Sequence, residues 1–150
     1  MPSLSIVSRR TDAPDHVGIL LWEAATAWKR RFTREMVAAG HPWFAEARGA
    51  LLRHIGRDGA SQGTIAARAG LTKQAVQQHV DALVADGVAL RADDPADARR
   101  RIVRLTAAGR AALDEGDRIK ARLEADLARR LGDERLAALR AMLEEVAAGD

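Results

Sequence analysis

The sequence predicts a mainly α-helical fold with one small β-hairpin, and three observations lead to that prediction. Apolar residues recur at helical spacing over most of the chain. A glycine-containing break separates two short helical stretches near the middle of the chain. Directly after the second stretch, two strand-like runs flank a turn that is rich in aspartate and contains a proline.

Two helices joined by a tight turn are predicted near the middle of the chain. Gly70 follows an apolar run, and glycine suits the left-handed conformation that ends many helices. Thr72 can cap the next helix by accepting a hydrogen bond from an amide of its first turn. Leu71 and Val76 have the spacing of a hydrophobic staple, and the small side chain of Ala66 allows close approach of the two helices. These signals together predict a helix-turn-helix.

The second of these helices is expected to have one apolar and one polar face. The apolar positions, expected to face the core, are Val76, Val80, Leu83 and Val84. The opposite face carries Gln74, Gln77, Gln78 and Asp81, with Lys73 at the start of the helix. A glutamine can form two hydrogen bonds to adenine in the major groove, and a lysine is suited to a phosphate. Glutamines are also ordinary surface residues, but three of them beside a helix-turn-helix favour contact with DNA bases.

A β-hairpin with a basic tip is predicted directly after this helix. Its strands are expected at residues 88–91 and 101–105, with the turn at residues 93–97. Four arginines lie at and beyond the tip: Arg99, Arg100, Arg101 and Arg104. An arginine at such a tip can enter a narrow minor groove, and we expect Asp97 to orient Arg99 through a forked hydrogen bond. The alternative is a solvated charge run that discourages aggregation at a sheet edge.

The predicted fold class is therefore mainly α with a small β-wing, in which a winged helix-turn-helix core is flanked by N- and C-terminal dimerisation helices. We expect one domain of residues 1–150, with the DNA-binding lobe at residues 43–106 and mainly dimerisation helices at residues 14–40 and 107–148. The predicted DNA-binding residues are Thr72, Lys73, Gln74, Gln77, Gln78, Asp97, Arg99, Arg100 and Arg101.

Four short segments resemble the MarR family of winged-helix regulators: residues 71–76 (LTKQAV), 83–87 (LVADG), 94–99 (DPADAR) and 105–109 (LTAAG). The resemblance implies a homodimer that binds a pseudo-palindromic operator in double-stranded DNA, usually as a repressor and often released by a small ligand. It also places Asp97 and Arg99 at the wing aspartate–arginine positions of the family. Ala98 stands where the family usually has another arginine, so one phosphate contact of the wing is expected to be missing unless Arg100 or Arg101 replaces it.

Composition narrows the class of protein. A chain of 150 residues with 47% hydrophobic content can form a sizeable core. Since no apolar segment is long enough for a membrane span and residues 1–10 lack the core of a signal peptide, we expect a cytoplasmic protein without a membrane partner. The absence of cysteine excludes disulfides, thiolate metal sites and cysteine-based oxidation sensing. Residues 60–110 hold eight basic and five acidic side chains, so the whole net charge of +3 falls in the proposed DNA-binding unit.

Amphipathic helices are predicted on both sides of the helix-turn-helix. Before it, a helix capped by Asp15 is expected to reach residue 39, followed by a second helix at residues 43–57. After the wing, Thr106 is expected to cap a helix that ends before Gly132, where a last helix follows. The apolar positions of these helices are Val17, Leu20, Leu21, Ala24, Trp28, Phe32, Ala47, Leu51, Leu52, Ile55, Leu113, Ile119, Leu123, Leu127, Leu136, Leu139, Leu143 and Val146. Because the C-terminal arm begins after the wing is complete, its apolar stripe favours pairing with a second chain.

The sequence does not identify a small-molecule effector. Candidates for its site are Trp22, His41 and Trp43, because in relatives of the family aromatic effectors lie between the first helix and the DNA-binding lobe. A place in the core or the dimer interface is the simpler interpretation of these residues. Arg48 and Arg53 could bind an acidic ligand, but surface arginines are common.

No catalytic function is predicted. The histidines (His16, His41, His54 and His79) lack the spacing of a metal site, no phosphate-binding glycine loop is found, and we expect no cofactor. His79 is expected to pack beside the core face of its helix. The alternative function is a winged helix that binds protein instead of DNA. Such a module should expose apolar residues on its second helix, where this chain has glutamines.

Overall fold

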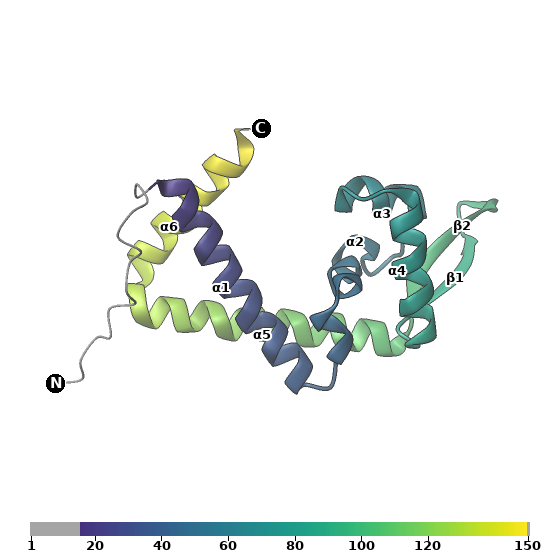
Figure 1. Ribbon diagram of the computed structural model, residues 1–150, viewed down its shortest axis with the longest axis horizontal. Coiled ribbons are helices and arrows are strands. Elements are labelled where there is room, and N and C mark those ends of the chain that lie inside the picture. Colours follow the sequence, from purple (N-terminus) through teal and green to yellow (C-terminus); the bar gives the residue numbers. More distant parts are fainter. Residues whose placement is uncertain (1–15, 150) are drawn as a thin grey trace. The chain divides into compact units, whose positions relative to one another are not determined.

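The computed structural model describes residues 16–149, which divide into two parts at residues 31 and 32. The described chain is mostly helical with one two-stranded antiparallel sheet, as the sequence predicts. The elements are α1 (Val17–Ala38), η1 (Pro42–Ala45), η2 (Ala47–Leu51), α2 (Leu52–Ile55), α3 (Gln62–Ala69), α4 (Lys73–Ala85), β1 (Ala89–Asp94), β2 (Asp97–Leu105), α5 (Ala107–Leu131) and α6 (Asp133–Ala148) (Figure 1). Asp15, the expected cap of α1, lies outside the described residues. Among residues 16–149, no helix is both long and apolar enough to cross a membrane.

The helix-turn-helix has the local geometry that the sequence predicts. The side-chain oxygen of Ser61 accepts a hydrogen bond from the amide of Thr64 and so caps α3. Gly70 ends α3 in the left-handed conformation, at φ +64°. Thr72 then accepts from the amide of Ala75 at 3.1 Å and caps α4. The tight turn between the two helices therefore depends on two residues: Gly70, which ends α3, and Thr72, which begins α4.

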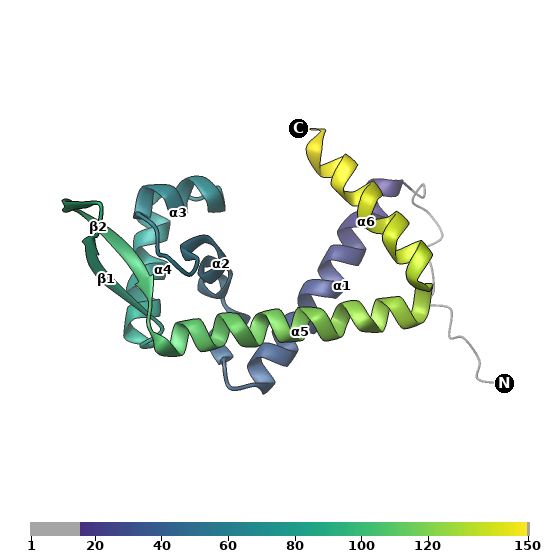
Figure 2. The ribbon, with the colours of Figure 1, turned by 180° about the vertical axis from the view of Figure 1, so that it is seen from behind.

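The hydrophobic core of the lobe lies between α2, α3, α4 and the hairpin, at one end of α5 (Figures 1 and 2). Ile65 of α3 and Val76, Val80 and Leu83 of α4 are fully buried. Each such side chain contributes about 1.5–3 kcal/mol when it leaves water. The expectation that Val84 also faces the core was wrong, because Val84 is 37% exposed. It lies eight residues after Val76, where the helical rotation has carried it beyond the buried stripe.

The expected helix at residues 43–57 was also wrong. The segment forms the two 3₁₀ helices η1 and η2 and the short α2, and Glu46 interrupts them in an extended conformation (φ −103°, ψ 163°). Gly49 packs so tightly on Phe44 that a Cβ atom at Gly49 would lie 2.7 Å from the Phe44 Cα atom. The apolar side chains Leu51, Leu52 and Ile55 are nevertheless buried in the core, as expected, whereas Ala47 is exposed.

The hairpin is longer than the sequence suggests. Strands β1 and β2 extend to a two-residue turn, Pro95 and Ala96, in which an Asp94 carboxylate oxygen accepts from the Ala96 amide. At its other end β2 gains a second neighbour, since the backbone groups of Ala60 and Val103 exchange two hydrogen bonds. This pairing attaches the wing to the segment that leads into α3.

The start of α5 is fitted closely to the end of α4. Thr106 caps α5 by accepting from the Gly109 amide, and its hydroxyl donates to the Gly87 carbonyl at 2.7 Å. A Cβ atom at Gly109 would lie 2.0 Å from the Val88 carbonyl oxygen, so only glycine fits this position. The first turns of α5 thus belong to the lobe.

Further along, α5 packs on the end of α1 that belongs to residues 32–149. Phe32 and Met36 lie against Gly116, and Ile119 and Leu123 are fully buried. By contrast, no residue of α6 is buried.

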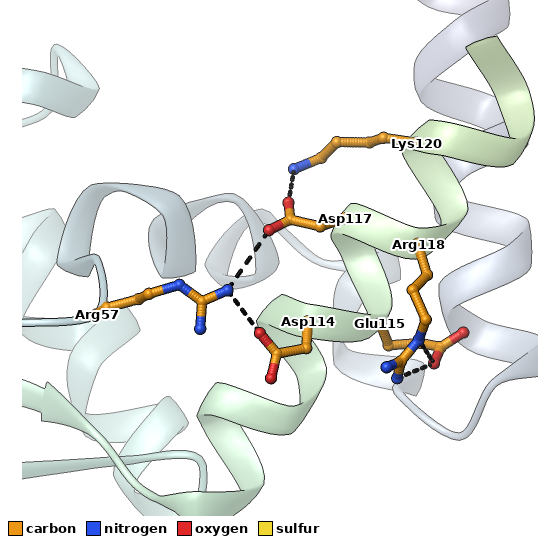
Figure 3. A network of polar contacts seen from close by, with 6 residues as sticks. All are labelled: Arg57, Asp114, Glu115, Asp117, Arg118 and Lys120. Carbon is orange, nitrogen blue, oxygen red and sulfur yellow. Dashed lines mark hydrogen bonds and ion pairs between the residues drawn. The ribbon is translucent and has the colours of Figure 1, made fainter.

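An ionic network links the loop after α2 to α5 (Figure 3). The Arg57 Nη2 atom lies 2.5 Å from a carboxylate oxygen of Asp114 and 3.6 Å from one of Asp117. Lys120 pairs with Asp117 on its other side at 3.1 Å and lies over the Phe32 ring. Because the side chains of Arg57 and its partners are about half exposed, this network orients the loop more than it stabilises the fold.

Candidate nucleic-acid interface

The polar face of α4 is open to solvent. Lys73, Gln74, Gln77 and Gln78 are all exposed, while the opposite face of the helix is buried against α3 and the rest of the core. The helix lies between α3 and the hairpin, so its polar face and the wing belong to one lobe (Figure 1). Thr72 precedes these residues, and its hydroxyl is engaged in the cap of α4. Helix α4 therefore presents four polar side chains from its first two turns, the part that a recognition helix inserts into the major groove.

Two of the wing arginines lie at a shift in the register of the hairpin. Asp93 pairs with Arg101 and Asp94 pairs with Asp97, so residues 98–100 of β2 have no partner positions on β1. Arg99 and Arg100 lie within this irregular stretch and are exposed, and the Arg99 side chain is 91% exposed. An irregular stretch directs side chains away from the regular pleat, which suits an arginine that must reach beyond the sheet.

Asp97 holds Arg99, although in a different way from the expected fork. One carboxylate oxygen, Oδ1, accepts from the Arg99 backbone amide at 3.1 Å and from its Nε atom at 3.2 Å. The expectation of a fork between two guanidinium nitrogens was wrong, because the residues are two positions apart and the backbone amide is the nearer donor. Only the Nε atom of the guanidinium takes part in this contact, and the Arg99 side chain is 91% exposed to solvent.

A shallow hollow lies between the wing tip and the start of α3. It has a volume of about 350 Å³ and is lined by Ser61, Thr64 and Arg68 on one side and by Asp94 and Arg100 on the other. Arg68 is partly committed elsewhere, since it donates to the His54 carbonyl at 3.0 Å. Sequence reasoning did not find this hollow, because the Ala60–Val103 pairing that forms it joins segments distant in sequence.

Two acidic residues of the helix-turn-helix are each covered by an arginine from another element. Arg91 of β1 donates from Nη2 to Asp81 Oδ1 at 2.6 Å, and Arg48 of η2 donates from Nε to Asp86 Oδ2 at 2.8 Å. Arg48, considered above for an acidic ligand, is therefore engaged within the lobe. Arg91 was not among the predicted site residues. No local signal marks it, because its partner is ten residues away across the end of α4.

The candidate effector residues fall in different environments. Trp43 is buried in the core and contacts Phe44, with ring centroids 4.6 Å apart. The His41 ring lies edge-on to Trp43 at 5.7 Å. Trp22, in residues 16–31, is 78% exposed. Arg53 donates to the His54 ring at 3.2 Å, and His79 is half-buried beside the core face, as expected.

Comparisons with known proteins agree with this architecture. The model of the MarR family matches residues 47–100. The transcriptional repressor CouR, solved bound to a 23-mer DNA duplex, is 30% identical, with a TM-score of 0.68 over 88% of this chain and 92% of CouR. The comparison with curated proteins found no match.

Two more distant structures show the fold. MarR from E. coli, in its apo form, is 21% identical with a TM-score of 0.68 and covers 89% of this chain and 98% of MarR. MepR from S. aureus, in complex with DNA, is 19% identical with a TM-score of 0.67 and covers 89% of this chain and 95% of MepR. The chain is a winged helix-turn-helix protein, and it belongs to the MarR family of transcriptional regulators.

Proposed function

We propose that this regulator binds a specific site in double-stranded DNA, with α4 in the major groove and the wing arginines on the adjacent minor groove. The proposal depends on one observation, which is that a single lobe exposes two polar features to solvent. One is the face of α4 that carries Lys73, Gln74, Gln77 and Gln78, and the other is the exposed side chain of Arg99. Glutamines supply bidentate base contacts and arginine supplies charge for phosphates or a narrow groove. CouR and MepR, both solved with DNA, support the same use of the fold.

A homodimer is part of the proposal. Large apolar side chains remain exposed on the first turns of α1 and on α6, among them Leu20, Trp22, Leu143 and Val146. A second copy of the chain would cover them. Two-fold symmetry would then present two α4 helices to half-sites separated by about one turn of DNA, roughly 34 Å. The expected operator is therefore pseudo-palindromic.

Repression, release by a small aromatic or acidic ligand, and action in the cytoplasm complete the proposal. Repression and release by a small ligand follow from what the family resemblance implies. Action in the cytoplasm is proposed because no apolar segment of the sequence predicts a membrane span. Since Trp43 is used in the core, it is not available to such a ligand without rearrangement. The rival function, a winged helix that binds protein, is disfavoured because the exposed face of α4 is polar.

The test is a selection from a pool of random duplexes, followed by fluorescence anisotropy on the enriched duplex and on a scrambled one over a salt series. We expect enrichment of two related half-sites about 10 bp apart, and affinity that falls steeply with salt. Failure to enrich any sequence, with equally weak binding to both duplexes at low salt, would overturn the proposal in favour of the protein-binding alternative.

A further inference from the structure

The recognition face of α4 contains one negative charge. Asp81 follows Gln77 by four residues, so the two side chains lie on the same side of the helix. Its carboxylate is 55% exposed. A bare carboxylate at this position would repel the phosphates of any bound duplex, whatever its sequence.

The structure matches this charge with a single, well-placed arginine. Arg91 comes from β1, the strand that begins the wing, and its guanidinium lies 2.6 Å from Asp81 with 30% of the side chain exposed. A charge-assisted hydrogen bond of this length joins the wing to the recognition helix. The two charges cancel, so this part of the polar face adds no net attraction for DNA.

We propose that Asp81 and Arg91 form a specificity-determining pair. Asp81 keeps Arg91 away from the phosphate backbone, and Arg91 prevents Asp81 from repelling DNA and holds the wing against α4. Binding then depends on the glutamine contacts and on the wing tip, which can discriminate between sequences. This inference rests on the proposed function, because it assigns a role within the same DNA-binding surface.

The charge argument gives opposite results for the two partners. Asp81→Asn removes one negative charge without changing the size of the side chain, so Arg91 becomes free to contact phosphate. Affinity for the scrambled duplex should then rise about three- to tenfold, with a salt dependence steeper by about one counterion per protomer. Affinity for the enriched duplex should not rise as much, so the specificity ratio falls. Arg91→Ala should instead weaken binding to both duplexes, since it leaves the carboxylate uncovered.

The chain offers a matched control on α5. Arg118 donates to Glu115 at 2.6 Å, so Glu115→Gln removes the same charge from an ion pair with the same distance. We would measure the four proteins (wild type, D81N, R91A and E115Q) by anisotropy on the enriched and scrambled duplexes, after checking equal helical content by circular dichroism. We expect E115Q to keep the wild-type ratio within about twofold.

The outcomes separate this inference from the proposed function. A wild-type protein without selectivity overturns the proposed function and this inference with it. If the wild type is selective but D81N has the same ratio of affinities for the enriched and scrambled duplexes, the role proposed for Asp81 and Arg91 is overturned and the proposed function is not. A D81N protein that changes its preference at one base pair, with scrambled-duplex affinity unchanged, also overturns it, because Asp81 would then contact a base such as cytosine directly.

Discussion

The helix-turn-helix lobe and helix α6 are both rich in apolar residues, but they use them in different ways. In the lobe, Ile65, Val80 and Leu83 are fully buried within the chain. In α6, Met142 and Leu143 are exposed, Val146 is 63% exposed, and no residue is buried. The lobe is stabilised by its own core, whereas the later turns of α6 have apolar side chains that residues 16–149 leave exposed.

This difference shows that the position of an apolar residue in the sequence does not decide what it packs against. Leu123 and Leu143 occupy similar positions in amphipathic helices, yet Leu123 is fully buried and Leu143 is exposed. Leu123 is covered by the described residues of its own chain, whereas the same residues leave Leu143 exposed to solvent. Exposed apolar patches of this kind mark interaction sites, which supports the proposed dimer.

The largest expected effect comes from breaking the core of the lobe. Leu83→Ala should lower the free energy of unfolding by about 2–5 kcal/mol, because it removes a fully buried side chain and leaves a cavity. Urea denaturation followed by circular dichroism at a fixed protein concentration measures this loss. The neighbouring Val84→Ala is the control, since Val84 is partly exposed and should cost much less. Equal losses would contradict the assignment of the two faces of α4.

The second prediction concerns the exposed apolar residues of α6 and tests whether they form the dimer interface. Replacing Leu143 and Val146 together with glutamate should give a monomer with a folded lobe, because both side chains are exposed within the chain. Operator affinity should fall about 100-fold or more, since each half-site then binds without the effective concentration that a dimer supplies. Light scattering and circular dichroism give mass and helical content, and Glu145→Gln is the control on the same helix. A dimer of unchanged stability would place the interface elsewhere.

Leu123 would be the wrong residue for that test. It was expected to lie on the dimerisation stripe of its helix, but it is fully buried within the chain, so a polar substitution would unfold the protein before it reported on assembly. The sequence could not separate Leu123 from Leu143, because both have helical apolar spacing and only the tertiary fold distinguishes them.

Local signals allowed most of the lobe to be predicted. The caps at Thr72 and Thr106, the left-handed Gly70 and the polar face of α4 depend on residues within one helical turn of each other. The features that were missed depend on long-range packing. The break at Glu46 accompanies the contact of Gly49 with Phe44, and the Asp81–Arg91 pair depends on how β1 folds back along α4.

The third prediction sharpens the comparison by testing function in the lobe without changing its core. Arg99→Ala should lower affinity for the enriched duplex about tenfold and reduce the salt slope by about one per protomer, because an exposed positive charge of the wing is lost. Stability should not change, since the side chain is almost fully exposed. Arg135→Ala, an exposed arginine of α6 with the same charge change, is the control. Equal affinities of R99A and wild type would remove the wing tip from the interface.

The smallest expected effect is a change in the pH dependence of stability, and it comes from His54 of α2, at the edge of the lobe core. Helix α6 has no histidine. Burial of His54, helped by the positive charges of Arg53 and Arg68, lowers its pKa below the usual value of 6.5. The unfolded chain therefore binds a proton at a higher pH than the folded lobe does. The free energy of unfolding is therefore unaffected by this histidine above pH 6.5, and it decreases as the pH falls from 6.5 toward the lowered pKa.

His54→Gln should reduce that loss, because glutamine does not titrate. We would measure the urea midpoints of wild type and variant at pH 7.5, 6.5 and 5.5. The midpoint of the wild type should fall more than that of the variant as the pH falls. His16→Gln is the control, since His16 is exposed and precedes α1. Parallel midpoints for wild type and H54Q would show that the histidine takes up its proton equally in the folded and unfolded chains. The surroundings of His54 in α2 would then be as accessible to water as those of α6. The difference in burial between the lobe and α6 would in that case apply only to the core residues of α3 and α4.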